Sequence, residues 1–563
     1  MKAKLSTCSS LVLLLLVAGV SVSSAQVDAV RLKTINHRLQ QQLKTYNRFP
    51  ANIRQAMDGN SNAAYFAGAF KNMIPALSKP MSRPAFSALA KAQLAVAASS
   101  GVSSVSDNST DLDLSGLAGF TQSETSTAWC GNNVVVGFND SGSYLQTLVF
   151  GTGGLSFSGV AVSSNRGASF KDLGAVPPGS NFNNFLEGDP QVACTSASNF
   201  YYAQLFATSD SAGNPIASLG VSTSTDGGNS WSDPVPALNK DGFAHSIDKE
   251  WLSVDPSNSK RLYLSYTDFD FTFSSAACPN DLRQAIEVVS SKDGGVTWGT
   301  PAVVDTVCGF SDAVQGSHVV VGSTGQVNLA WVHFTNFPIG ARELRFTSYV
   351  PGKKPKGYTV ADGIVGGGDT FFLQGQFRNF LGLDMNVDRS GGPTDGTVYI
   401  TWDDGRDKSV PDVGGFSGSY GFADVLLRFS TDGGATWGFA PIKINSDLQP
   451  RVGYGHDHYQ PGIAIDSTGK VGACWYDRRV DNSNFGIERY CGTSADGSTW
   501  TNSKVAVPSF GPEHGTDGLI NPIYMGDYDG LASDYTKANS GFIGSFEVMT
   551  SKANPDIKAF SFK

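Results

Sequence analysis

The sequence predicts an all-β fold, a β-propeller, and three observations support this prediction. From about residue 113 onward, short apolar runs alternate with Gly, Asp and Asn turns, which is typical of strands. Gly (64) and Pro (25) together make up about 16% of the 563 residues, against a usual ~12%, which argues against a helical bundle. Two sequence units also recur at a spacing of roughly 60 to 80 residues, and repeats of this kind are typical of propeller blades.

The first repeated unit is a turn. Its copies are STDGGNSW (224–231), SKDGGVTW (291–298), STDGGATW (430–437), the shorter SADGSTW (494–500) and the degenerate SSNRGASF (163–170). In such a turn the Asp can accept backbone N–H groups, the Gly can adopt a left-handed conformation, and the Trp can pack beneath. We therefore expect the four aspartates to be structural: Asp226, Asp293, Asp432 and Asp496.

The second repeated unit is a hairpin. It has seven copies, which begin near residues 128, 190, 250, 318, 383, 461 and 528. Hairpin and turn units together predict four strands per repeat and a closed ring of seven blades, with six as the alternative if the first or last copy is not a blade. The last copy supplies three strands, so we expect a strand from about Leu112 to Phe120 to complete it and close the ring.

The repeated turn resembles the Asp box, and residues 113–563 are similar to the sialidase-like BNR-repeat propellers. In that family the Asp boxes lie on the side away from the active site. The resemblance therefore implies that these turns serve the fold and not the chemistry.

Two segments precede the predicted propeller. Residues 1–25 have the form of a secretory signal peptide, with Lys2 and Lys4, the apolar run Leu11–Val17 and a small-residue end at Ala25. That run is too short to span a membrane, so we expect a secreted protein, extracellular or periplasmic. Residues 26–112 are predicted to be a helical N-terminal segment followed by a Ser/Asp-rich linker, because the apolar residues between 32 and 46 are three or four positions apart.

The cysteines predict disulfide bonds. Six cysteines remain after the signal peptide, and an even number in an exported chain is typical of disulfides. Cys474 and Cys491 face each other across a predicted turn, and elimination leaves Cys278 with Cys308 and Cys130 with Cys194. No CxxC pair is present, and we expect neither a cofactor nor a metal.

The net charge of −9 without a basic block excludes nucleic acid as a partner. We expect a monomer whose partner is a carbohydrate or glycoconjugate, or a protein.

The candidate site lies at the mouth of the central channel, where loops enter each innermost strand. An Asp recurs after the aromatic residue of the hairpin unit, at 140, 268, 403 and 477, and is interpreted as part of the repeat. Polar residues unique to one blade are more informative: Glu187, Glu250, Arg378, His456, His458 and Tyr528. The segment from His456 to His458 could ligate a metal, but without a third ligand a hydrogen-bonded loop is favoured.

The family resemblance implies roles for these residues. The stretch YDGLAS around Tyr528 resembles that of the family's nucleophilic tyrosine, Glu187 or Glu250 would activate it, and Asp248 would be the acid. The remaining candidates would bind the substrate, with arginines on its carboxylate: Arg378, Arg451, Arg478, His456 and His458. The family's Arg-Ile-Pro motif is absent, since the corresponding stretch ETSTAWCGNN has no arginine.

Three functions are compatible with these residues. The first is an exported, sialidase-like glycoside hydrolase that acts on terminal sugars, sialic or otherwise acidic, at the channel mouth. The alternative is a non-catalytic propeller that binds a glycan or a protein, because fold does not imply function. The third is a lyase or another polysaccharide-degrading enzyme that uses His and Arg at the mouth.

Overall fold

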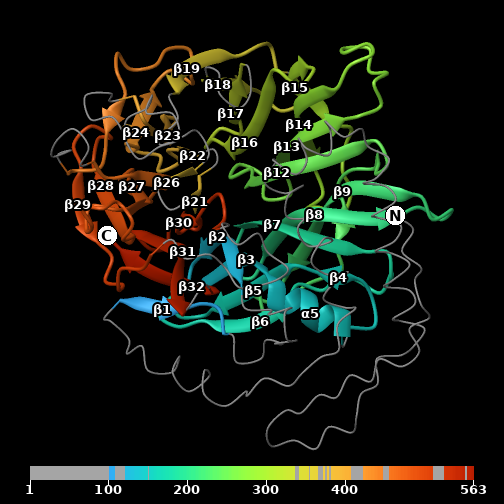
Figure 1. Cartoon of the computed structure of the whole chain (residues 1–563), viewed down its shortest axis with the longest axis horizontal. Coiled ribbons are helices and arrows are strands. Elements are labelled where there is room, and N and C mark those ends of the chain that lie inside the picture. The colour runs from blue at the N-terminus through green and yellow to red at the C-terminus, as the bar shows by residue number, and fades with distance from the viewer. Residues whose placement is uncertain are drawn as a thin grey trace, which may run out of the picture.

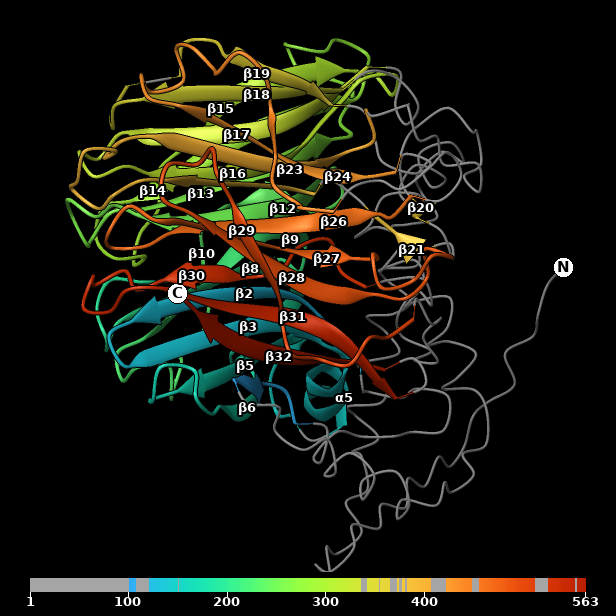
Figure 2. The same cartoon turned by 90° about the vertical axis from the view of Figure 1, so that its left-hand side faces the viewer.

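The computed structural model describes residues 101–107, 121–149, 151–335, 342–353, 355–364, 372–373, 377–379, 382–406, 422–447, 455–511, 525–551 and 554–563. The predicted signal peptide, the predicted helices before residue 100 and the strand predicted at 112–120 lie outside these residues. Seven sheets surround a common centre (Figure 1), which confirms the prediction of seven blades. Figure 2 shows the sheets from the side, with the strands running across the thickness of the ring.

Six blades are built in sequence order from the centre outward. Blade 1 contains β2 (Gln122–Cys130), β3 (Asn133–Asp140), β5 (Ser158–Ser163) and β6 (Lys171–Ala175). Blade 2 contains β7 (Phe185–Cys194), β8 (Phe200–Ser209), β9 (Pro215–Ser224) and β10 (Val235–Pro236), with β4 (Leu155–Ser156) beside β7 and β11 (Lys240–Asp241) beside β9. Blade 3 contains β12 (His245–Val254), β13 (Leu262–Asp270), β14 (Arg283–Ser291) and β15 (Ala302–Cys308).

The next three blades follow the same order. Blade 4 contains β16 (Ala313–Val321), β17 (Val327–Phe334), β18 (Arg342–Tyr349) and β19 (Thr359–Ile364). Blade 5 contains β22 (Leu383–Val387), β23 (Val398–Asp404), β24 (Asp424–Ser430) and β25 (Ile442–Lys443). Blade 6 contains β26 (His458–Ile465), β27 (Val471–Asp477), β28 (Glu488–Ser494) and β29 (Thr501–Lys504), while β20 (Phe372–Leu373) and β21 (Phe377–Arg378) form a separate pair.

Blade 7 closes the ring with strands from both ends of the described chain. Its inner strands are β30 (Leu531–Ser533), β31 (Phe542–Ser551) and β32 (Asn554–Phe562), and its outer strand is β1 (Val102–Ser104), which pairs antiparallel with β32. The closing strand therefore comes from the N-terminal side, as expected, but from residues that the sequence analysis assigns to the linker. The N–H of Val105 extends this contact by donating to the carbonyl of Ile557 at 2.9 Å.

The repeated turns have the geometry that the sequence predicts. In the turn of blade 3, the hydroxyl of Thr297 donates to Asp293 Oδ2 at 2.5 Å and its N–H donates to Asp293 Oδ1 at 2.9 Å, and these hydrogen bonds lower the pKa of Asp293 to about 2. Gly294 and Gly295 are left-handed, with φ of 81° and 86°. The indole N–H of Trp298 donates to the carbonyl of Gly295 at 3.2 Å. Asp293 is thus occupied by its own turn.

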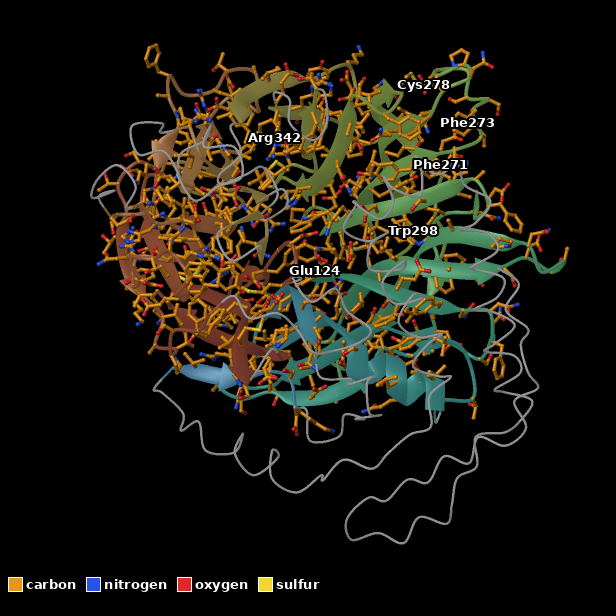
Figure 3. All side chains as sticks on the ribbon, viewed as in Figure 1. Glu124, Phe271, Phe273, Cys278, Trp298 and Arg342 are labelled. Carbon is orange, nitrogen blue, oxygen red and sulfur yellow. A yellow bond between two sulfur atoms is a disulfide. The ribbon has the colours of Figure 1, made fainter. Side chains whose placement is uncertain are left out.

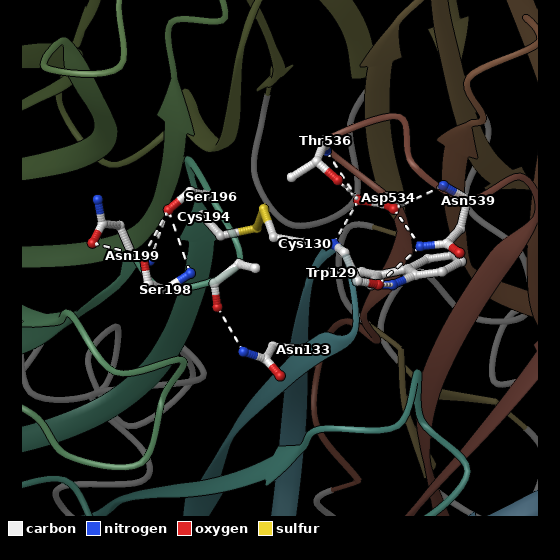
Figure 4. The surroundings of a disulfide bond; sticks show 12 residues. Trp129, Cys130, Asn133, Cys194, Ser196, Ser198, Asn199, Asp534, Thr536 and Asn539 are labelled. Atoms are coloured by element: carbon white, nitrogen blue, oxygen red, sulfur yellow. Dashed lines mark hydrogen bonds between the residues drawn. A yellow bond between two sulfur atoms is a disulfide. The ribbon is translucent and has the colours of Figure 1, made fainter.

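The core lies between neighbouring blades. One cluster joins Val332 and Phe346 of blade 4 to Met385 and Trp402 of blade 5. All three predicted disulfides are present, Cys130–Cys194, Cys278–Cys308 and Cys474–Cys491. The first joins blade 1 to blade 2, next to the contact of Asp534 with the N–H of Gly131 at 2.9 Å (Figure 4).

A helix that the sequence analysis did not predict, α5 (Ser141–Val149), follows β3 in blade 1. Asp140 caps its first turn, because its Oδ1 accepts the N–H of Gly142 at 2.9 Å and its Oδ2 accepts the hydroxyl of Ser143 at 2.5 Å. Among the described residues, no helix is long and apolar enough to cross a membrane.

Candidate functional site

The inner strands of the blades share an irregularity near the end of the channel where they begin, which we call the upper mouth. In β2, β7, β12, β16 and β26 the register shifts by a β-bulge. Four non-glycine residues at these bulges are left-handed, namely Glu124 (φ 52°), Asp189 (φ 55°), Lys249 (φ 52°) and Gln460 (φ 54°). Strained residues of this kind cluster at functional sites, and bulges redirect side chains there.

Three of these residues meet in one ion-pair cluster. Lys249 Nζ lies 3.1 Å from Glu124 Oε1, 3.6 Å from Asp189 Oδ2 and 2.6 Å from Asp527 Oδ2. Burial opposes the charge of Lys249, but the carboxylates of Asp189, Asp527 and Glu124 raise its pKa well above the usual value. Figure 3 labels Glu124 at the centre, where the inner strands converge. Blades 1, 2, 3 and 7 thus share one charged cluster at the upper mouth.

Glu250, next to Lys249 in β12, is a buried acid. It is 2% exposed, and neither of its side-chain oxygens has a hydrogen-bond partner among the described residues. Burial, and then the charge of Asp189, raises the pKa of Glu250 well above its usual value. The carboxyl group is therefore expected to keep its proton at neutral pH, as a general acid must.

Tyr528 of blade 7 reaches the same place. Its hydroxyl donates to the carbonyl of Pro190 at 3.3 Å, and its ring centroid lies 5.2 Å from Lys249 Nζ. Burial, followed by the charges of Asp189, Glu124 and Glu250, raises the pKa of Tyr528 well above 10. A pocket of about 20 Å³ lies beside Tyr528 and Glu250, which is room for about one water molecule.

The other two predicted catalytic residues flank this cluster. Asp248 is 2% exposed and accepts a short hydrogen bond from the side-chain amide of Gln315. Glu187 is half-buried in β7, and burial together with the charge of Asp189 raises its pKa to about 8. The structure therefore brings Tyr528, Glu250 and Asp248 to the inner strands at the upper mouth, and Glu187 lies two residues before Asp189.

The predicted arginines are placed differently. Arg478 has no exposed surface, and its Nη1 donates to the carbonyl of Asn484 at 2.7 Å, so it cannot reach a sugar carboxylate. Arg378 lies in β21, outside the seven blades. Arg451 lies outside the described residues. Among the described side chains, no arginine cluster faces the upper mouth.

The predicted histidines lie between blades 5 and 6. His458 is fully buried, its Nδ1 is 3.0 Å from the carbonyl of Ala423, and its Nε2 is 3.0 Å from Asp447 Oδ1. Burial opposes its charge, but Asp477 and Asp447 raise the pKa of His458 to about 9. His456 Nδ1 lies 3.7 Å from Asp447 Oδ2.

Asp424, Asp447 and His458 are close enough together to hold a metal ion. However, Asp424 Oδ1 already lies 2.8 Å from Lys443 Nζ and accepts the side-chain amide of Asn445 at 2.9 Å. A protonated His458 adds a second cation to this group. These contacts fit an ion-pair network better than a metal centre, which needs a neutral histidine.

Sequence reasoning missed the role of Glu124 and Lys249. They are 125 residues apart, and only the ring brings them together. The structure shows that Glu124 is a charged residue in β2, a strand whose side chains are all buried.

The chain was compared with protein-family models, curated proteins and solved structures. No family model and no curated protein matches the chain. Similar solved structures include a Penicillium chrysogenum α-L-arabinanase with arabinobiose (11% identity, 65% of this chain, 92% of the other, TM-score 0.39). They also include a Hadza microbial sialidase (12%, 72% and 73%, 0.37) and an ulvan lyase from a new polysaccharide lyase family (10%, 78% and 94%, 0.43). At these identities and scores, the function of this chain has to be argued from its own site.

Proposed function

We propose that this chain is an exported glycosidase that acts on a terminal sugar at the upper mouth of its channel. The observation that carries the proposal is Glu250, an acid that is 2% exposed and has no hydrogen-bond partner among the described residues, beside the phenol of Tyr528. A buried carboxyl group without a partner destabilises the fold, and such groups are concentrated at active sites.

The two residues have complementary roles in glycoside cleavage. Glu250 donates its proton to the glycosidic oxygen as the bond to the anomeric carbon breaks. Tyr528 supplies the phenolic oxygen that bonds to that carbon, and its proton passes to Asp189, the carboxylate that most strongly affects its pKa. Water then cleaves the glycosyl–tyrosine bond, Asp189 returns the proton to Tyr528, and Glu250 takes back its proton from that water.

Lys249 places its charge among three carboxylates other than Glu250. Its ammonium group lies within 3.6 Å of carboxylates of Glu124, Asp189 and Asp527, which stabilises their ionised forms. Glu250 makes no hydrogen bond with Lys249, and its burial raises its pKa well above the usual value although the charge of Lys249 opposes this shift. Neighbouring carboxyl groups with different environments are what an acid and a base in one site require.

The charge of the mouth indicates the class of sugar. Five carboxyl groups besides Glu250 lie at or next to it, Glu124, Glu187, Asp189, Asp248 and Asp527, and Lys249 is the cation among them. A sialic or uronic acid would bring another negative charge to this place, which electrostatics disfavours. We therefore propose a neutral or amino sugar as the substrate.

A panel of fluorogenic glycosides tests the proposal. We expect the purified protein to hydrolyse a neutral or amino glycoside and Tyr528→Phe to lower kcat by at least about 100-fold. The matched control is Tyr358→Phe, because Tyr358 is 43% exposed on blade 4, and its activity should be unchanged. Hydrolysis of the sialoside would overturn the substrate class, and failure to cleave any glycoside would overturn the enzymatic function.

A second candidate is a glycan-binding propeller without catalysis. The pocket of about 20 Å³ favours it, because a sugar ring cannot enter that space and must rest above the mouth. Binding on a glycan array, weakened by Tyr528→Phe in the absence of any turnover, would support this candidate over the first.

A further inference from the structure

The lower part of the channel contains an arginine, Arg389, for which no ion pair is found among the described residues. Arg389 follows β22 and lines a pocket of about 140 Å³ between the inner strands, well beyond the ~15 Å³ that one water needs. Its guanidinium lies 5.3 Å from the ring centroid of Tyr535. Among the described residues, no hydrogen bond or ion pair of Arg389 exists beyond this contact.

The carboxylate next to Arg389 in sequence is already satisfied. Asp388 Oδ1 accepts the N–H of Ser390 at 2.7 Å, and its Oδ2 accepts the hydroxyl of Thr394 at 2.6 Å. Burial lowers the pKa of Arg389 although Tyr535 and the charge of Asp388 act against this shift, and a guanidinium in a protein remains charged. A half-buried cation is stabilised by an anion that pairs with it in the pocket.

The two other charged residues that line this pocket are also paired. Asp384 Oδ2 accepts the N–H of Ile463 at 2.7 Å, and Asp529 Oδ2 accepts Arg489 Nη1 at 2.8 Å. Asp384 lies at the opposite end of β22 from Arg389, on the order of 15 Å away along an extended strand. Arg389 is therefore the one cation among the described residues that line the pocket.

We propose that the lower channel binds a small oxyanion, a carboxylate being the best fit, with the guanidinium of Arg389 as its partner. The planar fork of arginine matches two oxygens of a carboxylate. The face of Tyr535 holds the guanidinium in place on its other side. This site is separate from the upper mouth and does not depend on the proposed glycosidase activity.

Binding of ¹³C-labelled acetate, followed by the line width of its NMR signal, tests this site in the full-length protein. We expect saturable broadening with a dissociation constant on the order of 1 mM, typical of a ligand with so few atoms, and competition by sulfate. Arg389→Gln should weaken binding at least about tenfold. The control Arg261→Gln, at an arginine that is 39% exposed outside the pocket, should leave it unchanged.

Three results would overturn the proposal. They are the absence of saturable binding by the wild-type protein, binding that survives in Arg389→Gln, and chloride competing as well as acetate, which would reveal a simple point-charge site. If Arg389→Gln does not fold, Arg389→Lys provides the same comparison, because it keeps the charge and loses the fork. Undiminished acetate binding by that variant would contradict the bidentate contact.

Discussion

Lys249 combines two features that are rarely found together in one residue, a left-handed backbone and a buried charge. Its φ is 52° and its side chain is 7% exposed. Each feature is unfavourable by itself, and the three carboxylates around Nζ offset both. The cluster therefore depends on Lys249 more than on any one of its acidic partners.

Replacing this lysine tests that dependence. Lys249→Met should lower the unfolding free energy at pH 7 by about 3–5 kcal/mol, because it leaves Glu124, Asp189 and Asp527 buried without a cation. The loss should shrink at acid pH, since the uncompensated carboxylates then bind protons more readily in the folded state. Denaturant unfolding measures both effects. An equal loss from Lys260→Met, at an exposed lysine, would contradict the interpretation.

His458 predicts a second pH dependence. Its pKa is about 9 in the folded protein and about 6.5 unfolded, so its stabilising contribution is fully present below pH 6.5 and is lost as pH rises through 9. His458→Asn should therefore reduce the unfolding free energy on the order of 3 kcal/mol at pH 6, and by much less at pH 10. A reduction that is the same at both pH values would show that His458 is neutral in the fold.

At the scale of elements, the repeated turn explains why blades could be recognised from the sequence. The hydrogen bonds that the Asp and the Trp of blade 3 make within the turn fall inside eight residues, so each copy carries its own structural signal. The β-bulges carry no such signal, because a bulge is defined only against the neighbouring strand. Glu124 and Lys249 were therefore not recognised as partners, and the burial of Arg478 by Asn484 could not be read from its position after a strand.

The turn of blade 5 contains two adjacent glycines that make a matched pair. Both are left-handed, Gly433 with φ 71° and Gly434 with φ 86°, but a Cβ at Gly434 would lie 2.0 Å from Phe346, whereas one at Gly433 meets nothing within 4 Å. Gly433→Ala should cost about 1 kcal/mol from backbone strain, and Gly434→Ala at least about 2 kcal/mol more. Equal losses in thermal unfolding would show that Phe346 yields freely.

The whole molecule is a ring, and its stability depends on the contacts that join one blade to the next. The closing strand β1 pairs with β32, and Cys130–Cys194 joins blades 1 and 2. The number of blades was predictable because the repeats could be counted. The position of the closing strand was not predictable, because β1 is only three residues long and its composition differs little from that of a linker.

The disulfides provide a test at this scale. Cys130–Cys194 closes 64 residues and Cys474–Cys491 closes 17, so chain entropy predicts losses of about 4 and about 3 kcal/mol when each pair is replaced by alanine. Denaturant unfolding under non-reducing conditions measures the difference. A larger loss from the Cys474–Cys491 pair would show that joining blades 1 and 2 adds little to the ring.

Glu250→Gln tests directly whether the protein is a glycosidase, with turnover measured on the glycoside that the wild-type protein hydrolyses best. We expect kcat/KM to fall at least about 100-fold while the unfolding free energy at pH 8 stays the same or rises. The raised pKa of Glu250 makes the wild-type fold lose stability as pH rises above about 4.5, and glutamine removes that loss. Unchanged turnover, or a loss of turnover accompanied by a loss of stability, would contradict the assignment of Glu250 as the proton donor.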